Sequence, residues 1–158
     1  MRRKDREVTE MEDILNIIKK CDICRIALFD EEYPYIIPMN FGYSYEEGIL
    51  KLFFHGAKEG TKLSLIEKNP KAAFEMDCSH RLITGEAACD YSMDYESVCG
   101  NGTIRILDPG QTSFALSCLM QQYTKDIDLS YKEAYLNAIT VMELTVEHIT
   151  GKRRHSKE

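Results

Sequence analysis

Residues 49–62 read ILKLFFHGAKEGTK, and this stretch decides most of what the sequence says about the fold. From Ile49 to His55 large apolar side chains recur at every second position, which is the period of a β-strand. Gly56 and Gly60 then let the chain turn sharply, and we predict a short helix after them that stops at Asn69-Pro70. The elements predicted before and after this strand-turn-helix unit complete the fold.

The segments before this unit are predicted to be strands of an antiparallel sheet. Ile23–Leu28 alternates apolar and polar side chains, and Tyr35–Phe41 is extended but contains Pro38, which suits an edge strand. Tyr45–Gly48 is typical of a hairpin turn. The short spacing leaves no room for crossover helices, so neighbouring strands are expected to run antiparallel.

The remaining elements complete a mainly β pattern. Gly100 and Gly102 indicate a bulge or a close approach of two backbones within a long strand. Roughly six or seven strands without βαβ alternation predict a small antiparallel barrel with peripheral helices, a single domain over 1–158 with a polar tail from about 150 to 158 that is expected to fray after its first residues. Further strands are expected over 72–78, 82–88, 95–107 and 142–148, and helices over 11–20 (Thr9 as N-cap, in a capping box with Glu12), 114–123 and 131–137.

Composition and charge exclude several classes of protein. Hydrophobic residues make up 44% and charged residues 29% of the chain, which is the balance of a soluble globule. The net charge of -6 disfavours general nucleic-acid binding, which needs a basic surface against phosphate. No apolar run approaches the ~20 residues that span a bilayer, and no apolar segment follows the basic N-terminus as in a signal peptide. We therefore expect a cytoplasmic protein with neither membrane nor nucleic-acid partners.

The cysteines are expected to be reduced and mostly buried. A chain of 158 residues can bury a sufficient core without disulfides. Cys21 and Cys24 have the CxxC spacing, but no second pair follows at zinc spacing, so no metal is expected. The six cysteines are Cys21, Cys24, Cys78, Cys89, Cys99 and Cys118.

Two lysines stand where the predicted helix begins. The N-terminus of a helix offers free N–H groups and a partial positive charge, which suit a phosphate. Lys58 and Lys62 lie four residues apart, so both amines can project to one side of the first turn. The order of glycines and lysines is not that of a Walker loop, so magnesium-dependent phosphoryl transfer is not expected. The residues alone leave two alternatives open: an anion site, or a loop with two solvated lysines.

His55 and Asn40 are the other candidates near this turn. A histidine at a strand end can be a structural hydrogen-bond donor, but its closeness to a candidate phosphate site favours a ligand-facing role. Asn40 follows an irregular strand segment, whose unpaired backbone groups must bond to something. A flat heterocycle would satisfy them, and so would water.

Three ordered stretches together resemble a known family. They are Cys24–Leu28 (CRIAL), Pro34–Tyr43 (PYIIPMNFGY) and Phe54–Lys62 (FHGAKEGTK), followed by Asn69–Lys71, Tyr95–Gly100 and Ile149–Arg153. The set, which covers nearly the whole chain, resembles the pyridoxamine 5'-phosphate oxidase-like flavoproteins. Within them it is most similar to the Nim-type group named for 5-nitroimidazole resistance.

The resemblance implies an antiparallel split β-barrel that binds FMN as a homodimer, with the cofactor near the subunit interface. It implies that the isoalloxazine ring is bordered by backbone groups and that the phosphate meets lysines. Ser97, on the long strand, would reach the flavin from the neighbouring region, and His55 would be the catalytic proton donor or orienting group. The implied cofactor-binding residues are Pro38, Met39, Asn40, Phe41, His55, Gly56, Ala57, Lys58, Lys62 and Ser97.

One departure from the family concerns Glu96. Relatives often carry an arginine at this place, and an acid would oppose a phosphate, so Glu96 is expected either to turn away or to form a different contact. The basic residues expected of a true pyridoxamine-phosphate oxidase are absent as well. The leading hypothesis is an FMN-dependent oxidoreductase that acts on a small-molecule substrate, such as a nitroaromatic compound, with a separate electron donor. The alternative is a flavin- or haem-binding carrier or sensor without turnover.

Overall fold

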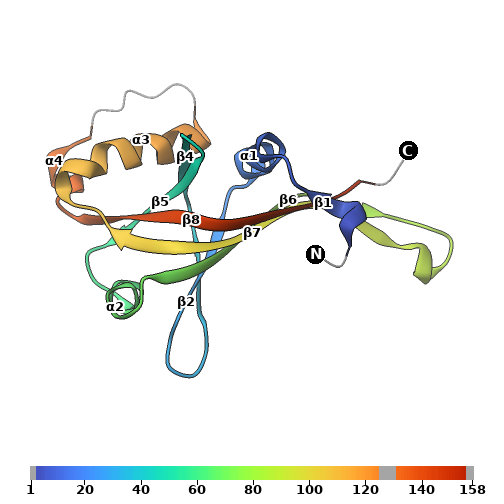
Figure 1. Cartoon of the computed structure of the whole chain (residues 1–158), viewed down its shortest axis with the longest axis horizontal. Coiled ribbons are helices and arrows are strands. Elements are labelled where there is room, and N and C mark those ends of the chain that lie inside the picture. Colours follow the sequence, from blue (N-terminus) through green and yellow to red (C-terminus); the bar gives the residue numbers. More distant parts are fainter. Residues whose placement is uncertain (1–2, 125–130, 156–158) are drawn as a thin grey trace.

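The computed structural model describes residues 3–124 and 131–155. Within these ranges the chain forms eight strands and four α-helices, and Figure 1 shows their arrangement. The strands are β1 Glu7–Val8, β2 Cys24–Leu28, β3 Tyr35–Met39, β4 Gly42–Glu46, β5 Ile49–Ala57, β6 Lys71–Ile83, β7 Ser92–Ile106 and β8 Ile139–Arg154. The helices are α1 Met11–Lys20, α2 Thr61–Lys68, α3 Thr112–Tyr123 and α4 Glu133–Leu136, with 3-10 turns at Lys4–Arg6, Ala88–Asp90 and Pro109–Gln111.

The strands form one antiparallel sheet that closes on itself. Its order is β3-β2-β6-β7-β8-β5-β4, with β1 added beside β8. β3 and β4 are the two edges of this order, yet only Asn40 and Phe41 separate them along the chain. Because the edges must meet at this link, the sheet curls into a barrel with a seam between β3 and β4. The edge position predicted for the proline-containing strand is confirmed.

The barrel interior is filled by one apolar cluster. Alternate residues of β5 point into it, and Leu52 and Phe54 are fully buried there. α1 closes one opening with Ile14, Ile17 and Ile18, and α2 adds Leu63, Leu65 and Ile66.

A second, smaller cluster lies on the outer face of β5 under α3. Phe53, which points away from the barrel, is 1% exposed and meets the ring of Phe114 edge-on at 5.7 Å between centroids. α3 approaches β4 so closely that a Cβ on Gly42 would lie 2.2 Å from the backbone nitrogen of Leu119. Both faces of β5 are therefore covered in its middle, and Ile49 at its start and His55 and Ala57 near its end are exposed.

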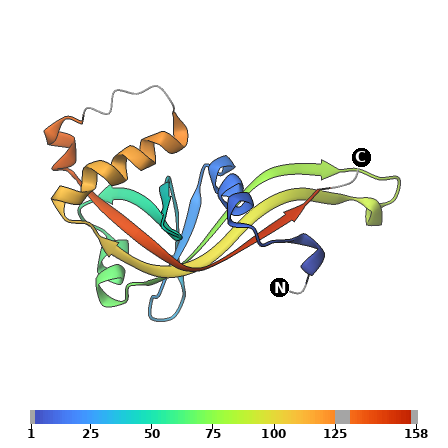
Figure 2. The ribbon, with the colours of Figure 1, turned by 45° about the horizontal axis from the view of Figure 1, so that its top comes forward.

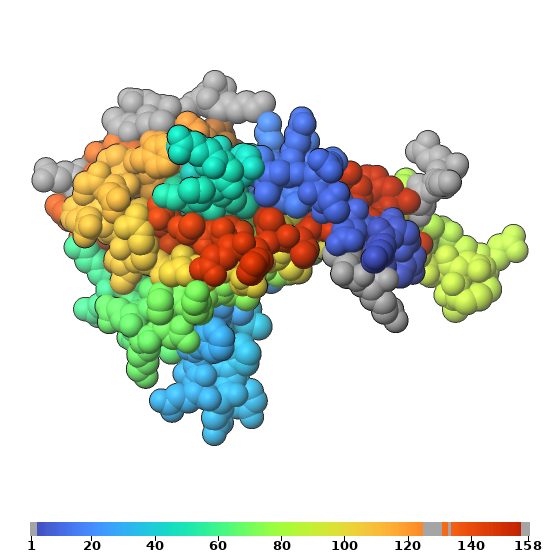
Figure 3. Space-filling view, viewed as in Figure 1, coloured from blue at the N-terminus to red at the C-terminus, as the bar shows by residue number. Residues whose placement is uncertain are grey.

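β6, β7 and β8 run on past the barrel as an arm. Figures 1 and 2 show the β6–β7 hairpin and both termini of the chain at this end. In the space-filling view of Figure 3 the hairpin of the arm and the β2–β3 hairpin both stand out from the body. α1 covers one face where the arm leaves the barrel, and the opposite face carries Ser97.

Three expectations about element boundaries are wrong. α1 begins after Glu10, and the hydroxyl of Thr9 contacts the Glu10 carboxylate at 3.4 Å, so the predicted capping box does not form. The strand predicted over 82–88 is the end of β6 followed by a turn, since β6 stops at Ile83 and Asp90 accepts the N–H of Ala87 at 3.1 Å. The strand predicted over 142–148 runs on as far as Arg154, through the first residues of the predicted tail, because β7 pairs with β8 along this length and β1 pairs with it on the other side. Residues 156–158 of that predicted tail lie outside the described residues.

The glycine and turn predictions are confirmed. The β7–β8 register shifts between Asn101 and Gly102, and a Cβ on Gly102 would lie 2.0 Å from a backbone oxygen of β8. Glu47 and Gly48 both have positive φ, 51° and 81°, as a tight two-residue hairpin turn requires.

Candidate functional site

The end of β5 offers an unpaired backbone edge. β4 pairs with β5 only as far as Gly42 and Phe53, whereas β8 continues beside β5 to Ala57. In the described part of the chain, the edge of β5 that faces away from β8 therefore has no strand partner from Phe54 onward. His55 lies on this segment, opposite Val141 of β8, with its side chain exposed.

α2 begins with an uncapped first turn next to this edge. Gly60 precedes the helix with φ 138°, a conformation that L side chains rarely adopt, and no side chain caps the helix N-terminus. The first N–H groups of a helix have no partner within it, and their aligned dipoles favour a negative charge. The local sequence folds this way because Gly60 permits the turn and Pro70 follows the helix end at Lys68.

Lys62 returns from this helix over the end of β5. A Cβ on Gly56 would lie 2.7 Å from Cε and 3.0 Å from Nζ of Lys62, so only glycine leaves room for this side chain. Lys58 lines an adjoining hollow of about 330 Å³ with Gly60 and Ser64. Neither lysine takes part in an ion pair with another described residue. Lys62 does not line the hollow of Lys58, which also holds the acids Glu59 and Glu67. The turn thus offers free amides and two lysines without ion pairs, at the place where the sequence predicts an anion site.

The segment from Pro38 to Phe41 links the two edges of the barrel. By the β4–β5 register it continues from Gly42 in the direction of His55. The Phe41 side chain is fully buried, and its N–H donates to the hydroxyl of Tyr123 at 2.9 Å. The Asn40 amide donates to a backbone oxygen at 3.4 Å. The backbone of this segment is thus already partly satisfied by the chain itself.

Ser97 lies far from the other candidates within one copy of the chain. It is opposite Lys152 of β8, while His55 is opposite Val141, eleven residues away on the same strand. At about 3.3 Å per residue this is roughly 35 Å along the strand. A single chain therefore brings together the residues of β5 and α2 but not Ser97.

Glu96 forms a buried ionic cluster that the sequence did not reveal. It is 1% exposed and accepts hydrogen bonds from Lys20 and Arg153, each at 2.6 Å, and from Ser79 at 2.9 Å. Burial alone would raise its pKa, but these hydrogen bonds outweigh burial and lower it to about 2. Of the two expectations for Glu96, the different contact is the one observed. In the sequence, Glu96 stands midway between Asp94 and Val98, at alternate positions of the predicted strand. The structure buries the side chains of all three residues.

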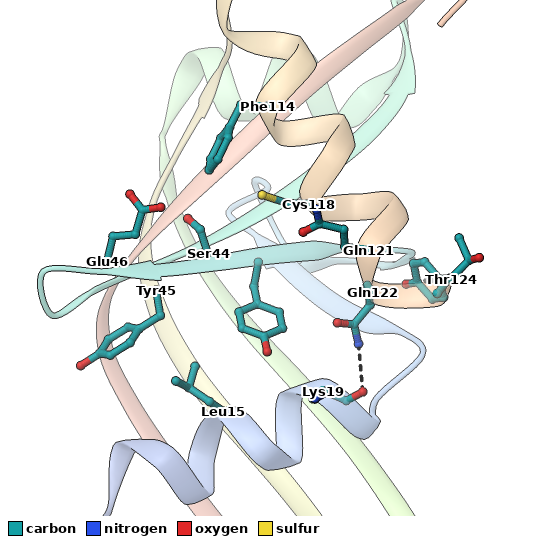
Figure 4. Close-up of a pocket in the computed structure, with 12 residues that line it drawn as sticks. Leu15, Lys19, Ser44, Tyr45, Glu46, Phe114, Cys118, Gln121, Gln122 and Thr124 are labelled. Carbon is teal, nitrogen blue, oxygen red and sulfur yellow. Dashed lines mark hydrogen bonds between the residues drawn. The ribbon is translucent and has the colours of Figure 1, made fainter. Parts of the chain in front are cut away.

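A second hollow, of about 720 Å³, lies on another side of the barrel. Figure 4 shows it between α1, β4 and α3, with Tyr45 extending toward Leu15 of α1 and Ser44 and Glu46 on the side of Phe114. The residues predicted for the cofactor do not line it. No sequence pattern indicated this hollow, because it depends on how two helices pack beside an edge strand.

The cysteines are free thiols in the structure. Cys21, Cys24, Cys78 and Cys118 are buried and Cys89 and Cys99 exposed, and burial raises the pKa of the Cys24 thiol. Within the described ranges no three His, Cys, Asp or Glu side chains gather as metal ligands would. None of the described helices has the length and apolar character needed to cross a bilayer.

The closed antiparallel sheet, its seam and the β5–α2 turn define a split β-barrel protein. The sequence model of the pyridoxamine 5'-phosphate oxidase family matches residues 10–153, and the chain belongs to this family. None of the curated proteins matches the chain.

Solved structures agree with this assignment. A candidate 5-nitroimidazole antibiotic resistance protein from Bacteroides thetaiotaomicron is 30% identical, with a TM-score of 0.79 over 92% of this chain and 85% of that one. The FAD and heme binding protein from Mycobacterium smegmatis has a TM-score of 0.81 at 16% identity, covering 96% of this chain and 74% of the other. The flavocytochrome Anf3 from Azotobacter vinelandii has a TM-score of 0.77 at 15% identity, covering 99% and 72%. The last two likenesses show the fold alone.

Proposed function

We propose that this chain is a homodimeric FMN-binding oxidoreductase that reduces small nitroaromatic compounds. The observation that carries the proposal is the ammonium group of Lys62 lying over Gly56, beside the uncapped start of α2. A Cβ at Gly56 would fill the space that the lysine occupies. Free amides and unpaired lysines are the donor set that a phosphate monoester requires.

Each group at the turn has a distinct task in this proposal. Lys58, Lys62 and the first amides of α2 would hold the phosphate, and the unpaired edge of β5 would lie beside the flavin ring. The segment from Pro38 to Phe41 would border the ring through its remaining backbone groups. When bound, FMN supplies the hydride and single-electron chemistry of the reaction.

His55 would hold and deliver a proton at its imidazole. Its side chain is exposed at the strand end, and it forms no hydrogen bond or ion pair with any other described residue. An imidazole free at both nitrogens can donate a proton to a substrate that gains electrons.

The dimer and the substrate class have separate support. Ser97 is about 35 Å along β8 from the β5 site, so it can serve a flavin only if a second copy brings it there. The substrate class is supported by the 30% identical relative, which carries a 5-nitroimidazole resistance name.

The first test is FMN uptake by the purified protein. Titration followed by fluorescence quenching is expected to give saturable binding, and the double variant Lys58→Met/Lys62→Met is expected to lose it. Lys68→Met, at the far end of α2, is the matched control and should bind as the wild type does. Binding unchanged in the double variant, or a haem Soret band without flavin uptake, would reject the proposal.

The second test is turnover. NAD(P)H-dependent reduction of a nitroimidazole is expected for the loaded protein and is expected to fall strongly in His55→Ala at unchanged FMN content. Full loading with FMN but no reduction of the nitroimidazole would reject the proposed enzyme and support the alternative, a flavin carrier or sensor without turnover.

A further inference from the structure

Two buried cysteines from distant parts of the chain contact the same backbone oxygen. The Cys21 thiol, at the C-terminal end of α1, donates to the carbonyl oxygen of Ile17 at 3.3 Å. The Cys78 thiol of β6 lies 3.9 Å from the same oxygen. Both side chains belong to the apolar cluster of the barrel, where Cys21 is 1% and Cys78 8% exposed. The two sulfur atoms are therefore neighbours, although the residues are far apart in the sequence.

The ionisation of Cys21 depends on this neighbour. Burial raises the pKa of the Cys21 thiol, and the Cys78 thiol beside it raises that pKa further. The pKa of Cys24, by contrast, is raised by burial and by the charge of Glu75, and no thiol hydrogen bond in the described ranges involves Cys24. The structure thus pairs Cys21 with Cys78, whereas the CxxC spacing alone would suggest Cys24.

A hollow of about 370 Å³ gives access to this pair from the side of Cys78. Its wall includes Cys78, Ser79 and His80 of β6 and Lys20 of α1, but not Cys21. A small solute that enters the hollow therefore meets Cys78 before Cys21.

The backbone beside each cysteine is irregular. β6 has a bulge directly after Cys78, where the pairing with β7 shifts before Arg81 and Ser79 has a φ of 58°. α1 ends at Lys20, and Cys21 is extended, with φ -81° and ψ 142°. Because regular secondary structure continues on only one side of each cysteine, both can make the small movement that an S–S bond of about 2 Å requires.

We propose that Cys21 and Cys78 form a reversible disulfide when the protein meets a hydroperoxide. The Cys78 sulfur takes the terminal oxygen of the peroxide and becomes a sulfenic acid, while the rest of the peroxide leaves as water or an alcohol. The Cys21 sulfur then displaces the hydroxyl group of the sulfenic acid, which leaves as water with the proton of Cys21, and the S–S bond forms. Two electrons pass from the thiols to the peroxide, and a thiol reductant reverses the change. This reaction is independent of the proposed FMN binding.

The bond joins α1 covalently to β6. α1 closes one opening of the barrel, and its last residue, Lys20, pairs with the buried Glu96 of β7. A disulfide across the long loop from Cys21 to Cys78 reduces the freedom of the unfolded chain, so the oxidised protein is expected to be the more stable form.

The first experiment counts thiols in the double variant Cys89→Ser/Cys99→Ser, which lacks the two exposed cysteines and keeps the four buried ones. The protein is treated with hydrogen peroxide, unfolded, alkylated with N-ethylmaleimide and weighed by mass spectrometry. Two of the four thiols are expected to resist alkylation, and dithiothreitol is expected to restore both. This count needs no substitution in the core, so it decides the matter even where an alanine variant fails to fold.

Peptide mapping identifies the two cysteines that are joined. Trypsin leaves Cys21 and Cys24 together on the peptide 21–25, so single variants in the same background must distinguish them. The link to the Cys78 peptide is expected to persist in Cys24→Ala, the matched control, and to disappear in Cys21→Ala. In Cys78→Ala all remaining thiols are expected to stay open to alkylation.

The second experiment follows thermal unfolding of the same double variant. Its melting temperature is expected to rise by roughly 5–10 °C on oxidation and to fall back with dithiothreitol. Addition of Cys78→Ala should abolish the rise, and addition of Cys24→Ala should preserve it.

Three results would overturn the inference: four thiols that stay open to alkylation after prolonged treatment with peroxide, a bridge between Cys21 and Cys24, or a sulfinic acid at Cys78 without a bridge. A bridge between Cys21 and Cys78 that leaves the melting temperature unchanged would overturn the stabilising link between α1 and β6.

Discussion

The buried carboxylate of Glu96 makes a quantitative prediction about stability. The substitution Glu96→Gln keeps the shape of the side chain but removes its charge, leaving Lys20 and Arg153 without their anion. A pKa near 2, against the ordinary 4.5, means that these partners favour the ionised carboxylate by roughly 3 kcal/mol, since one pKa unit corresponds to about 1.4 kcal/mol. The Lys20 and Arg153 side chains are 49% and 31% exposed, so solvent screens part of this, and we expect Glu96→Gln to cost about 2 kcal/mol at pH 7.

The free energy that the Glu96 carboxylate contributes to folding depends on pH. A carboxyl whose pKa is lowered by folding stabilises the protein above the pKa of the unfolded state and loses that contribution as the pH falls toward the folded value. For Glu96 the loss runs from about pH 4.5 down to about pH 2. The difference between wild type and Glu96→Gln should therefore be full at pH 7 and shrink steadily below pH 4.5.

Urea denaturation at a series of pH values measures the stability cost of Glu96→Gln at pH 7 and its decrease at low pH. Urea is suitable because it does not screen charges as guanidinium does. Glu147→Gln, an exposed substitution of the same kind on β8, is the control and should change stability little. The reasoning about Glu96 is refuted if Glu96→Gln is as stable as the wild type at pH 7, or if the difference persists undiminished at pH 3.

Three further substitutions test close contacts. Gly42→Ala places a Cβ against the backbone of α3 and should lower the free energy of unfolding by about 2 kcal/mol or more, measured by urea denaturation. Tyr123→Phe removes the acceptor of the Phe41 N–H and should cost about 1–2 kcal/mol in the same assay. Gly56→Ala displaces only the flexible end of Lys62, so the melting temperature should stay nearly unchanged while the Kd for FMN rises several-fold.

One substitution serves as a control for the glycine variants. A Cβ on Gly110 would meet nothing within 4 Å, so Gly110→Ala should affect neither stability nor FMN binding. Equal stability of the Gly42 and Gly110 variants would contradict the close packing of α3 on β4. Unchanged FMN affinity in Gly56→Ala would contradict the role given to the lysine above it. A Tyr123→Phe variant as stable as the wild type would contradict the contribution given to the hydrogen bond between the Phe41 N–H and the Tyr123 hydroxyl.

Much of the fold could be predicted because local patterns and tertiary structure agree in the barrel. The period-two segments are all strands, and the proline in β3 correctly places that strand at an edge. One error, the length of β8, arises where backbone pairing overrides the side-chain pattern. The polar stretch 150–154 is held as strand by β7 and β1, whose hydrogen bonds do not depend on hydrophobic side chains.

The candidate site, like the fold, could be predicted from the sequence only in part. The residues of the β5–α2 turn are close in sequence, so a glycine-lysine pattern was enough to place Lys58 and Lys62 on either side of the start of α2. Their role at a cofactor stays a prediction. The Glu96 cluster joins α1, β6, β7 and β8, and no local pattern encodes which cations meet a carboxylate from so many elements. The same holds for the Tyr123 hydroxyl, which reaches Phe41 from a distant helix.

Glu96 and Lys152 are also connected by the geometry of the sheet. Side chains alternate along a strand, so turning Glu96 and Arg153 toward α1 turns Ser97 and Lys152 to the opposite face. A slip of β8 by one residue against β7 would turn Arg153 to the opposite face and leave the buried Glu96 without this partner. The buried ion pair between β7 and β8 opposes such a slip, since a carboxylate stripped of its cations is costly in the interior. The acid at position 96 therefore contributes to the register of β7 and β8 and so keeps Ser97 and Lys152 on the face away from α1.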